Sequence, residues 1–405
     1  IFPMFKSLNF KVILFGFIFT FFSSFGQSFF LGLFNSSIRE TLSISHGQFG
    51  SIYASATLLS SFILVWIGKK IDDMNILRFS SYVIILLAIS CFLFSKISSI
   101  IFLFFAIFLM RLSGQGLMSH TATTTISRYF EKTRGRALST TWLGLSLAEF
   151  ILPLLIVFLL TITEWRSIWL SISVLIILVL PLISFYLVKN VNLDSREKLI
   201  NEEKNQKEIK QWKRIEVLKD YRFYIVCLNM LAMPWIATGT FVYQSFIASS
   251  KGWGPYVIAQ SFMVYSILSV ATLFFSGFLI DKYSSRRLLI YMNIPLLLSA
   301  FVLFYFNSPI SSFVFLGLIG ISNGLANVLG SSTWAEIYGV KYIGSIKALT
   351  TALMVFSTAF GTALFGFLID NSYSIEQIAL VSGFYILIAT ISLLFIRNRL
   401  NPNYI

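Results

Sequence analysis

The chain has 405 residues, of which 57% are hydrophobic and only 12% charged, and its mean hydropathy is +0.81. A soluble globular protein carries about 25% charged residues, so a chain with 43 Phe and so few charges cannot cover a surface in water. The composition predicts an all-α membrane protein with many spans, and it excludes disordered, collagen-like and disulfide-scaffold classes. Two Cys and two widely separated His predict no disulfide framework, no metal site and no cofactor.

Apolar runs of about 20 residues are long enough to cross about 30 Å of hydrocarbon as helices. Twelve such runs occur, at approximate positions 12–34, 49–67, 79–95, 99–127, 138–160, 167–188, 222–247, 257–280, 288–306, 311–334, 346–368 and 375–396. Backbone groups in lipid need partners within their own segment, so we expect twelve transmembrane helices. The first run is too long for a signal peptide and lacks a small-residue cleavage site, so we expect no cleavable signal.

The basic residues predict how the spans are oriented. When loops are assigned to alternate sides, nearly all of the 31 Lys and Arg residues fall on the side of the two termini. The opposite side holds only Arg39, Lys96, Arg166 and Lys251, and Arg111 lies inside the fourth run. The positive-inside rule then predicts a bacterial cytoplasmic membrane protein with both termini in the cytoplasm. Because the basic residues are scattered over many loops, we expect no nucleic-acid partner.

A long polar segment divides the chain into two sets of six spans. We expect an N-terminal six-helix bundle at 1–188, a cytoplasmic linker at 189–221 and a C-terminal six-helix bundle at 222–405. The mixed charge of the linker predicts a solvated, partly helical tether, and binding of lipid headgroups or regulation is the alternative.

An internal repeat relates the two halves. Identical residues recur at a constant offset of 209 in the loops after spans two and eight and after spans four and ten. The matched pairs are Gly68 and Gly277, Ile71 and Ile280, Asp72 and Asp281, Arg78 and Arg287, Tyr129 and Tyr338, and Gly135 and Gly344. Six spans per repeat give both halves the same orientation, which is typical of parallel repeats in transporters that work by alternating access.

The repeated loops also resemble a family signature. GKKIDDMNILR (68–78) and GFLIDKYSSRR (277–287) are similar to the Gly-x-x-x-Asp-Arg-x-Gly-Arg-Arg motif of the major facilitator superfamily. The first copy departs from it at Asp73 and Asn75. This resemblance implies two pseudo-symmetric six-helix bundles and secondary active transport.

Other segments bear on the branch of that family. RLSGQG (111–116) is similar to its Arg-x-x-x-Gly motif in span four, and 111–139 resembles the monocarboxylate and oxalate/formate-related branch. The family's antiporter signature in span five is absent, since 144–153 contains only its Gly144 and Pro153. This absence argues against drug efflux in exchange for protons. Span eight lacks the buried Arg of the oxalate and monocarboxylate members, which argues against a simple dicarboxylate site.

The signature loops are candidate gating elements: Gly68, Asp72, Arg78, Gly277, Asp281, Arg286 and Arg287. Asp72 and Asp281 lie at helix ends, where a carboxylate accepts hydrogen bonds from a neighbouring helix N-terminus and pairs with Arg. Gly68 and Gly277 are expected to permit close helix approach. These contacts are expected to latch the outward-open state; the alternative is that the loops only set topology.

Two charges, Arg111 and Glu149, lie near the middle of spans four and five. A charge at this depth costs at least about 2.5–3.5 kcal/mol and usually marks a pathway. Three readings stay open: Arg111 binds an anionic group of the substrate, Glu149 is the proton-coupling site, or the two form a structural ion pair.

Helical spacing selects further candidates for substrate binding. Gln115 shares a face with Arg111, whereas His120 lies on the opposite face and is expected to be a packing residue. Asn323 and Asn327 share a face with Trp334 in span ten, and the offset of 209 places that face next to the equivalent of Arg111.

Spans five, seven, one and two supply the remaining candidates. Trp142 and Ser146 share a face with Glu149. Trp235, Tyr243 and Gln244 follow an expected break at Pro234, and Gln27 and Tyr53 are weaker candidates. Packing or an interfacial aromatic belt is the alternative reading for each aromatic residue.

The leading prediction is a secondary transporter of a small organic, anionic solute of carboxylate type, working by alternating access with proton symport or exchange. Its expected partners are that solute and membrane lipid, and it is expected to be a monomer and not an enzyme. A drug or metabolite efflux antiporter and a non-transporting sensor are the alternatives. No Gly-x-x-x-x-Gly-Lys-Ser/Thr motif is present, so ATP is not expected to drive this chain.

Overall fold

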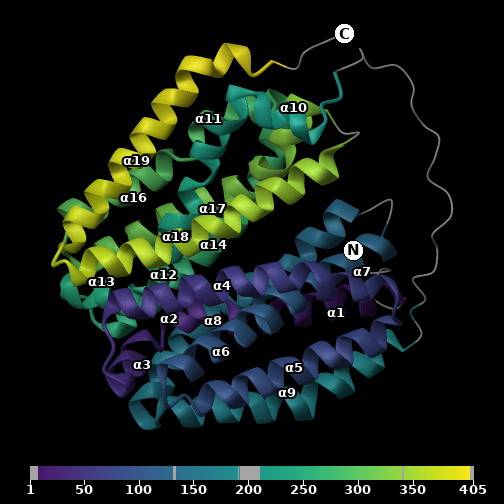
Figure 1. Cartoon of the computed structure of the whole chain (residues 1–405), viewed down its shortest axis with the longest axis vertical. Coiled ribbons are helices and arrows are strands. Elements are labelled where there is room, and N and C mark those ends of the chain that lie inside the picture. The colour runs from purple at the N-terminus through teal and green to yellow at the C-terminus, as the bar shows by residue number, and fades with distance from the viewer. Residues whose placement is uncertain (1–7, 131–133, 190, 192–209, 340–341, 402–405) are drawn as a thin grey trace. The chain divides into compact units, whose positions relative to one another are not determined.

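The computed structural model describes residues 8–130, 134–189, 191, 210–339 and 342–401, and in these residues it contains helices and turns but no strands (Figure 1). Within this described part, twelve helices are long and apolar enough to cross a membrane. They are Asn9–Gly32, His46–Lys69, Ile76–Ser95, Ile100–Tyr129, Arg136–Ile162, Trp165–Val188, Tyr221–Val242, Pro255–Ile280, Ser285–Tyr305, Pro309–Tyr338, Ile346–Asp370 and Ile375–Arg399, here called spans one to twelve. The predicted all-α class with twelve spans is confirmed.

The chain divides into two compact units, Ile1–Lys198 and Leu199–Ile405. The helices of unit 1 are α1 (Leu8–Ser23), η2 (Ser24–Gly26), α2 (Ser28–Gly32), α3 (Asn35–Leu42), α4 (His46–Lys69), η3 (Lys70–Asp72), α5 (Ile76–Ser95), α6 (Ile100–Met110), η4 (Arg111–Met118), α7 (Ser119–Tyr129), α8 (Arg134–Ile162) and α9 (Trp165–Val188). Several spans are therefore built from two or three consecutive helical pieces.

The helices of unit 2 are α10 (Arg214–Lys219), α11 (Tyr221–Met230), α12 (Ala232–Val242), α13 (Gln244–Ser250), α14 (Pro255–Tyr283), α15 (Ser285–Leu288), η5 (Leu289–Tyr291), α16 (Ile294–Tyr305), α17 (Pro309–Tyr338), α18 (Ile343–Asp370), α19 (Ile375–Ile396) and η6 (Arg397–Arg399). Span seven breaks between α11 and α12, because the ring of Pro234 clashes with the carbonyl of Met230 one turn earlier. The break predicted at Pro234 therefore falls at Leu231.

The two units pair their spans in the same order. In unit 1, α1 packs on α8, α4 packs on α6 and η4, and α5 packs on α9. In unit 2, α12 packs on α18, α14 on α17, and α16 on α19. Figure 1 shows α5 beside α9 and α16 beside α19. Each unit thus joins its first and fifth spans, its second and fourth, and its third and sixth, as expected for a repeat.

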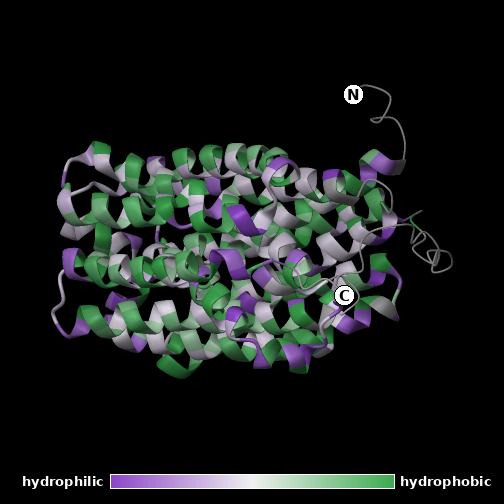
Figure 2. Cartoon of the chain, turned by 90° about the horizontal axis from the view of Figure 1, so that it is seen from above, coloured by the Kyte–Doolittle hydropathy of each residue, from purple (hydrophilic) through white to green (hydrophobic). Residues whose placement is uncertain are grey.

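Apolar side chains cover both the inside and the outside of each unit. Phe395, Phe278 and Leu182 are 83%, 75% and 72% exposed, which water would penalise but lipid does not. Figure 2 shows hydrophobic residues along the whole length of the helices. This distribution is that of a multi-pass integral membrane protein.

Much of the predicted linker (189–221) lies outside the described residues. Helix α10, near the end of the linker, is described and packs on unit 2. Asp220 caps α11 by accepting from the Arg222 backbone N–H at 3.0 Å, and it forms a buried ion pair with the Arg222 side chain at 2.8 Å. The Tyr338 hydroxyl at the end of span ten donates to the same carboxylate at 3.0 Å. This cluster ties the entry of span seven to the end of span ten.

A second buried cation closes the opposite end of unit 2. The Lys251 ammonium pairs with Glu376 at 2.7 Å and donates to the Asn307 side chain at 2.8 Å. The Trp253 indole N–H donates to the Asn307 carbonyl at 2.9 Å. One small polar cluster therefore joins the loops that precede spans eight and ten to the start of span twelve.

Candidate functional site

Span one is interrupted near one end, where the run SSFGQS (23–28) replaces large apolar residues. The helix tightens into the 3-10 turn η2, the backbone at Gln27 is extended (φ −83°, ψ 153°), and α2 then begins at Ser28. An extended residue cannot continue the helical hydrogen-bond ladder. Interruptions of this kind are tolerated at membrane depth where protein groups satisfy the freed backbone.

Span four widens into an eight-residue π-helix, η4, at the same place. Gly26 and Gly114 let the two irregular segments touch backbone to backbone, since a Cβ added at Gly114 would lie 2.6 Å from the Gly26 nitrogen. π-helical turns are rare in proteins, and those that do occur are often found at functional sites. The contact of two such segments marks this part of unit 1 as a candidate site.

Arg111, the first residue of η4, points into this junction. Its side chain is buried, and one terminal nitrogen donates to the Gly26 carbonyl at 3.0 Å and to the Ser28 hydroxyl at 3.4 Å. Arg111 thus supplies a partner to the interrupted backbone of span one.

Span two completes the cluster through Tyr53. The Arg111 guanidinium lies over the Tyr53 ring, 5.3 Å from its centroid, and the Tyr53 hydroxyl donates to the Ser28 hydroxyl at 3.2 Å. A cation over an aromatic face is stabilised by about 2 kcal/mol when both are out of water. Spans one, two and four therefore converge on one buried cation, and we call Gly26, Ser28, Tyr53 and Arg111 the Arg111 cluster.

No protein carboxylate neutralises this cation among the residues that the structure describes. Of the three readings left open, the structural ion pair with Glu149 is not formed among the described residues, and neutral oxygens and a ring take the place of the carboxylate. In addition, the buried Arg111 Nε–H has no hydrogen-bond partner among the described residues. An anionic group entering the cluster would supply both the missing charge and an acceptor.

The remaining polar candidates of unit 1 lie on spans four and five. Glu149 is a buried residue of α8, and it makes neither an ion pair nor a side-chain hydrogen bond within the described part of the chain. Gln115 is half-buried in η4, and Trp142 and Ser146 are half-buried on α8. Gln27 is half-buried at the interruption of span one. Their roles in binding stay predictions.

His120 has the packing role that was expected of it. Its Nε2 lies 3.0 Å from the carbonyl oxygen of Gly68, near the end of α4. A Cβ added at Gly68 would lie 3.2 Å from this imidazole nitrogen, so Gly68 permits a close approach of spans two and four, as predicted. In the part of the chain that the structure describes, no group of three or more His, Cys, Asp or Glu residues has the arrangement of a metal site.

In unit 2, spans eight and ten meet at Asn323. Its side-chain amide donates to the Ser269 hydroxyl at 2.9 Å and is half-buried, whereas Asn327 one turn further is exposed. Gly320 and Gly324 pack directly on the backbone of α14, as glycines four residues apart do between membrane helices. Asn323 is thus partnered within its own unit, and a binding role for either Asn stays a prediction.

The aromatic candidates of span seven lie in helix packing. The Trp235 ring makes edge contacts with Phe360, Phe365 and Tyr385, and the Tyr243 hydroxyl donates to the Thr362 carbonyl at 3.1 Å. Gln244 is buried and donates to the Phe241 carbonyl at 2.9 Å. Trp334 is also buried and stacks on Tyr338. These contacts favour the packing interpretation that was left open.

The signature loops differ in how closely they pack. A Cβ added at Gly277 would meet no described heavy atom within 4 Å, so the expected close helix approach is not seen at Gly277 within unit 2. Arg78 and Arg287 are exposed, Arg286 is half-buried, and the side chains of Asp72 and Asp281 lie outside those described. Glu336 of α17 caps α15, the helix that follows α14, by accepting from the backbone N–H groups of Ser285 at 2.8 Å and Arg286 at 3.3 Å.

Sequence reasoning missed three participants: Gly26, Ser28 and Glu336. Three Ser, one Gly and one Gln within six residues of an apolar run were the available signal for the first two. Glu336 lies near the end of its span, where a charge is unremarkable. Its capping role depends on the start of α15 in another span, and the sequence around Glu336 does not indicate that contact.

The comparisons with known proteins agree with this architecture. The sequence model of the Major Facilitator Superfamily matches residues 16–263 and 224–403. No curated protein sequence matches the chain.

Solved structures share the fold at low identity. An inward-facing, unoccupied bacterial homologue of the human lysosomal transporter Spinster is 14% identical, with a TM-score of 0.70 and coverage of 98% of each chain. The nucleoside transporter NupG is 13% identical, with a TM-score of 0.71 and coverage of 95% of this chain and 98% of its own. Since the family match spans most of the sequence, this protein belongs to the Major Facilitator Superfamily, a family of membrane transporters.

Proposed function

We propose that this protein is a secondary active transporter of a small organic anion, in which Arg111 binds the anionic group of the solute. The observation that supports this proposal is a buried guanidinium without a protein carboxylate and with an unpartnered Nε–H. The planar guanidinium can hold a carboxylate through two parallel hydrogen bonds, which a Lys ammonium cannot do. The solute binds and is released at this cluster as the protein alternates between its two open states.

A carboxylate-bearing solute is the proposed class within this function. The comparisons give no support to the resemblance to monocarboxylate and oxalate carriers, since the structures found belong to a Spinster homologue and a nucleoside transporter. The class therefore rests on the chemistry of Arg111 alone. Tyr53 and Ser28 add a ring face and a hydroxyl beside the guanidinium, which suit a small solute with an apolar part.

We propose that Glu149 carries the coupling proton in symport or exchange. It is buried in span five, and no described cation holds its carboxylate in the charged form. A carboxyl group without such a partner is free to take up and release a proton during the transport cycle.

The experiment is solute uptake by purified protein in liposomes, with labelled small carboxylates and an imposed pH gradient. Arg111→Gln and Arg111→Lys are expected to lower uptake at least tenfold, about the effect of one lost charge-assisted pair, although Lys keeps the charge. Asn371→Ala, at an exposed position of unit 2 that is no candidate for binding, is the folding-matched control. Unchanged uptake by Arg111→Lys would exclude Arg111 as the anion site, and binding without uptake in wild type would favour a sensor.

Glu149→Gln tests the coupling in the same liposomes. It is expected to keep exchange of solute across the membrane but to lose the response of net uptake to the pH gradient, because glutamine cannot release a proton. Glu149→Asp retains a carboxyl group and is expected to keep part of the response. A full response in Glu149→Gln would remove this residue from proton coupling.

The orientation of the chain is proposed from its charges. Both termini are placed in the cytoplasm of a bacterial cell by the excess of Lys and Arg on their side. A reporter that fluoresces only in the cytoplasm, fused after residue 405, is expected to fluoresce, and a periplasmic phosphatase at the same position is expected to be inactive. The reverse pattern would invert the orientation.

A further inference from the structure

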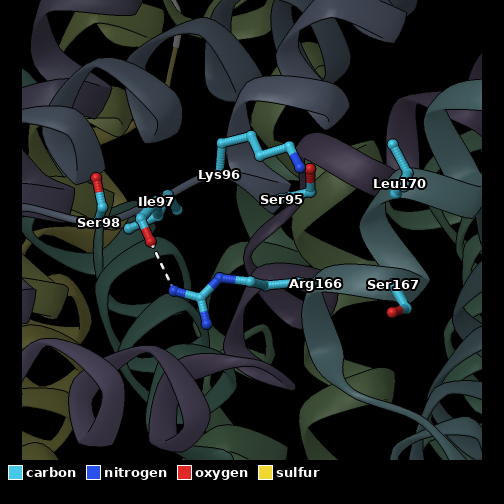
Figure 3. A pocket seen from close by; sticks show the side chains of 7 residues that line it. All are labelled: Ser95, Lys96, Ile97, Ser98, Arg166, Ser167 and Leu170. Atoms are coloured by element: carbon cyan, nitrogen blue, oxygen red, sulfur yellow. Dashed lines mark hydrogen bonds between the residues drawn. The ribbon is translucent and has the colours of Figure 1, made fainter.

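A polar pocket of about 380 Å³ lies in unit 1, away from the Arg111 cluster, where the turn between α5 and α6 meets the start of α9. Figure 3 shows the side chains that line it. They are Ser95, Lys96, Ile97, Ser98, Arg166, Ser167 and Leu170. Two cations and three hydroxyls thus line the pocket, and no carboxylate is among its lining residues.

Lys96 and Arg166 line the same pocket, although the loops on this side of the predicted spans contain few basic residues. Arg166 is held in place because its guanidinium donates to the Ile97 carbonyl at 2.8 Å and lies over the Trp165 ring at 4.6 Å. The Lys96 side chain is exposed and no described carboxylate pairs with it or with Arg166. Glu164 is exposed and does not line the pocket. The pocket therefore offers net positive charge to an anion.

The start of α9 strengthens this preference. Arg166 and Ser167 are in the first turn of a 24-residue helix, whose free backbone N–H groups carry partial positive charge. The same turn supplies the Ser167 hydroxyl to the pocket lining. A guanidinium, an ammonium and the positive end of α9 thus lie at one pocket, an arrangement that favours an anion such as a phosphate group.

Exposed apolar side chains lead away from the pocket along both helices. On α9, Leu170, Val174 and Leu178 follow Arg166 at steps of four residues, and all three are exposed. On α5, the exposed Phe92 and Ile89 precede Lys96 by four and seven residues. Steps of four and seven keep residues on one helix face. Each cation therefore lies at one end of a row of exposed apolar side chains.

We propose that this pocket binds the phosphate of an anionic phospholipid, with the acyl chains lying along the exposed faces of α5 and α9. A phosphate bound there would lie beside exposed apolar side chains of both helices, which acyl chains attached to that phosphate would cover. Arg166 and Lys96 hold the phosphate oxygens, and Ser98 and Ser167 add hydroxyl donors. The site is separate from Arg111 and Glu149, so it does not depend on the proposed transport function.

The test measures lipid binding by the purified full-length protein in neutral detergent with native mass spectrometry. Dihexanoyl phosphatidylglycerol, dihexanoyl phosphatidylcholine and inorganic phosphate are the three probes. The wild type is expected to bind phosphatidylglycerol at least tenfold more tightly than either other probe, because only this lipid combines net negative charge with acyl chains. The double variant Lys96→Gln/Arg166→Gln is expected to lose that preference.

Two further variants separate a specific site from general charge. Arg166→Lys keeps the charge and is expected to retain most of the preference, whereas Arg39→Gln removes a positive charge elsewhere in unit 1 and is expected to retain all of it. Equal binding of phosphatidylglycerol by wild type and double variant would overturn the proposal. Inorganic phosphate binding as tightly as phosphatidylglycerol would also overturn it, in favour of a soluble anion.

Discussion

Arg111 stays charged inside an apolar bundle because three neutral partners replace water around it: the Gly26 carbonyl, the Ser28 hydroxyl and the Tyr53 ring. Such partners stabilise a guanidinium but do not neutralise it. The charge therefore remains available to a solute. A paired Arg would first have to lose its carboxylate, at a cost of several kcal/mol.

Tyr53→Phe tests this arrangement at the level of one atom. The ring under Arg111 is kept and only the hydroxyl that donates to Ser28 is lost. One neutral hydrogen bond contributes about 1 kcal/mol, and this one lies within the protein, so the free energy of unfolding is expected to fall by about that amount. Because Ser28 also loses the partner that orients it beside Arg111, the affinity for an anionic solute is expected to fall by up to about fivefold. Binding titration and a thermal melt measure the two quantities, and an unchanged affinity would place the solute away from Tyr53.

Lys251 gives a second prediction at this scale, for stability instead of binding. Its ammonium is fully buried and pairs with the partly exposed Glu376. Lys251→Met leaves Asn307 without its donor and Glu376 without its counter-ion, which is expected to cost about 2 kcal/mol of folding free energy. Glu376→Gln is expected to cost more, because it leaves the fully buried ammonium without a counter-ion. Equal melting temperatures for wild type and Lys251→Met would contradict this role.

Single residues were predictable from the sequence only where charge alone decides. Arg111 and Glu149 stand out because a charge within an apolar run is rare. Their partners did not follow from the same reasoning: the depth of the two residues suggested an ion pair, and the structure gives Arg111 a backbone carbonyl from span one instead. Depth along a helix fixes one coordinate, whereas contact also depends on helix rotation and on irregular turns.

At the scale of elements, the interruptions of spans one and four carry the site. In a regular α-helix each carbonyl already accepts from an N–H of the same helix, so an interrupted turn is the better source of an acceptor for Arg111. The 3-10 turn η2 and the extended Gln27 end that ladder in span one, and η4 widens span four at the contact. Both irregular segments contain glycine, which allows backbone contact that no side chain permits.

Gly26→Ala and Gly277→Ala are a matched pair of substitutions. At Gly26 a Cβ would collide with the backbone of span four, and backbone cannot move aside, so we expect at least about 2 kcal/mol of destabilisation and loss of anion binding. At Gly277 nothing lies within 4 Å, and Ala is a better helix former by about 1 kcal/mol. Thermal melts are expected to shift in opposite directions, and a common destabilisation would contradict these packing assignments.

Span number and order were predictable because hydrophobicity and length suffice for them. The break of span seven was also expected from Pro234, although it falls three residues earlier, where the proline ring meets the preceding turn. The π-helix had no comparable signal, since Gly114 and Gly116 fit a regular membrane helix equally well. Gly277 shows the converse: a motif position identical to Gly68 does not imply the same contact.

The whole molecule repeats one pairing scheme in two units, with first and fifth, second and fourth, and third and sixth spans in contact. The offset of 209 in the signature loops is the sequence counterpart of this scheme. The repeat does not extend to the chemistry of the site: the offset from Arg111 leads to Gly320, which packs on the backbone of α14. The cation of the Arg111 cluster thus belongs to unit 1 only.

Cross-links within each unit test whether the units move as bodies. The Ser80 and Ser184 hydroxyls are 3.0 Å apart between spans three and six, and those of Ser261 and Ser312 are 2.8 Å apart between spans eight and ten. If transport uses rigid motion of each six-helix repeat, a Cys pair at either site is expected to oxidise without slowing uptake. Uptake that stops on oxidation and recovers on reduction would indicate rearrangement within a unit.

The most direct test of the anion site is calorimetric binding of matched solutes to the purified protein, using a small carboxylate and its neutral amide. Wild type is expected to bind the carboxylate at least tenfold more tightly than the amide, and Arg111→Lys is expected to reduce that difference strongly while remaining folded. Equal binding of the carboxylate and the amide by wild type, or an undiminished preference in Arg111→Lys, would contradict the assignment of Arg111 as the group that binds the solute.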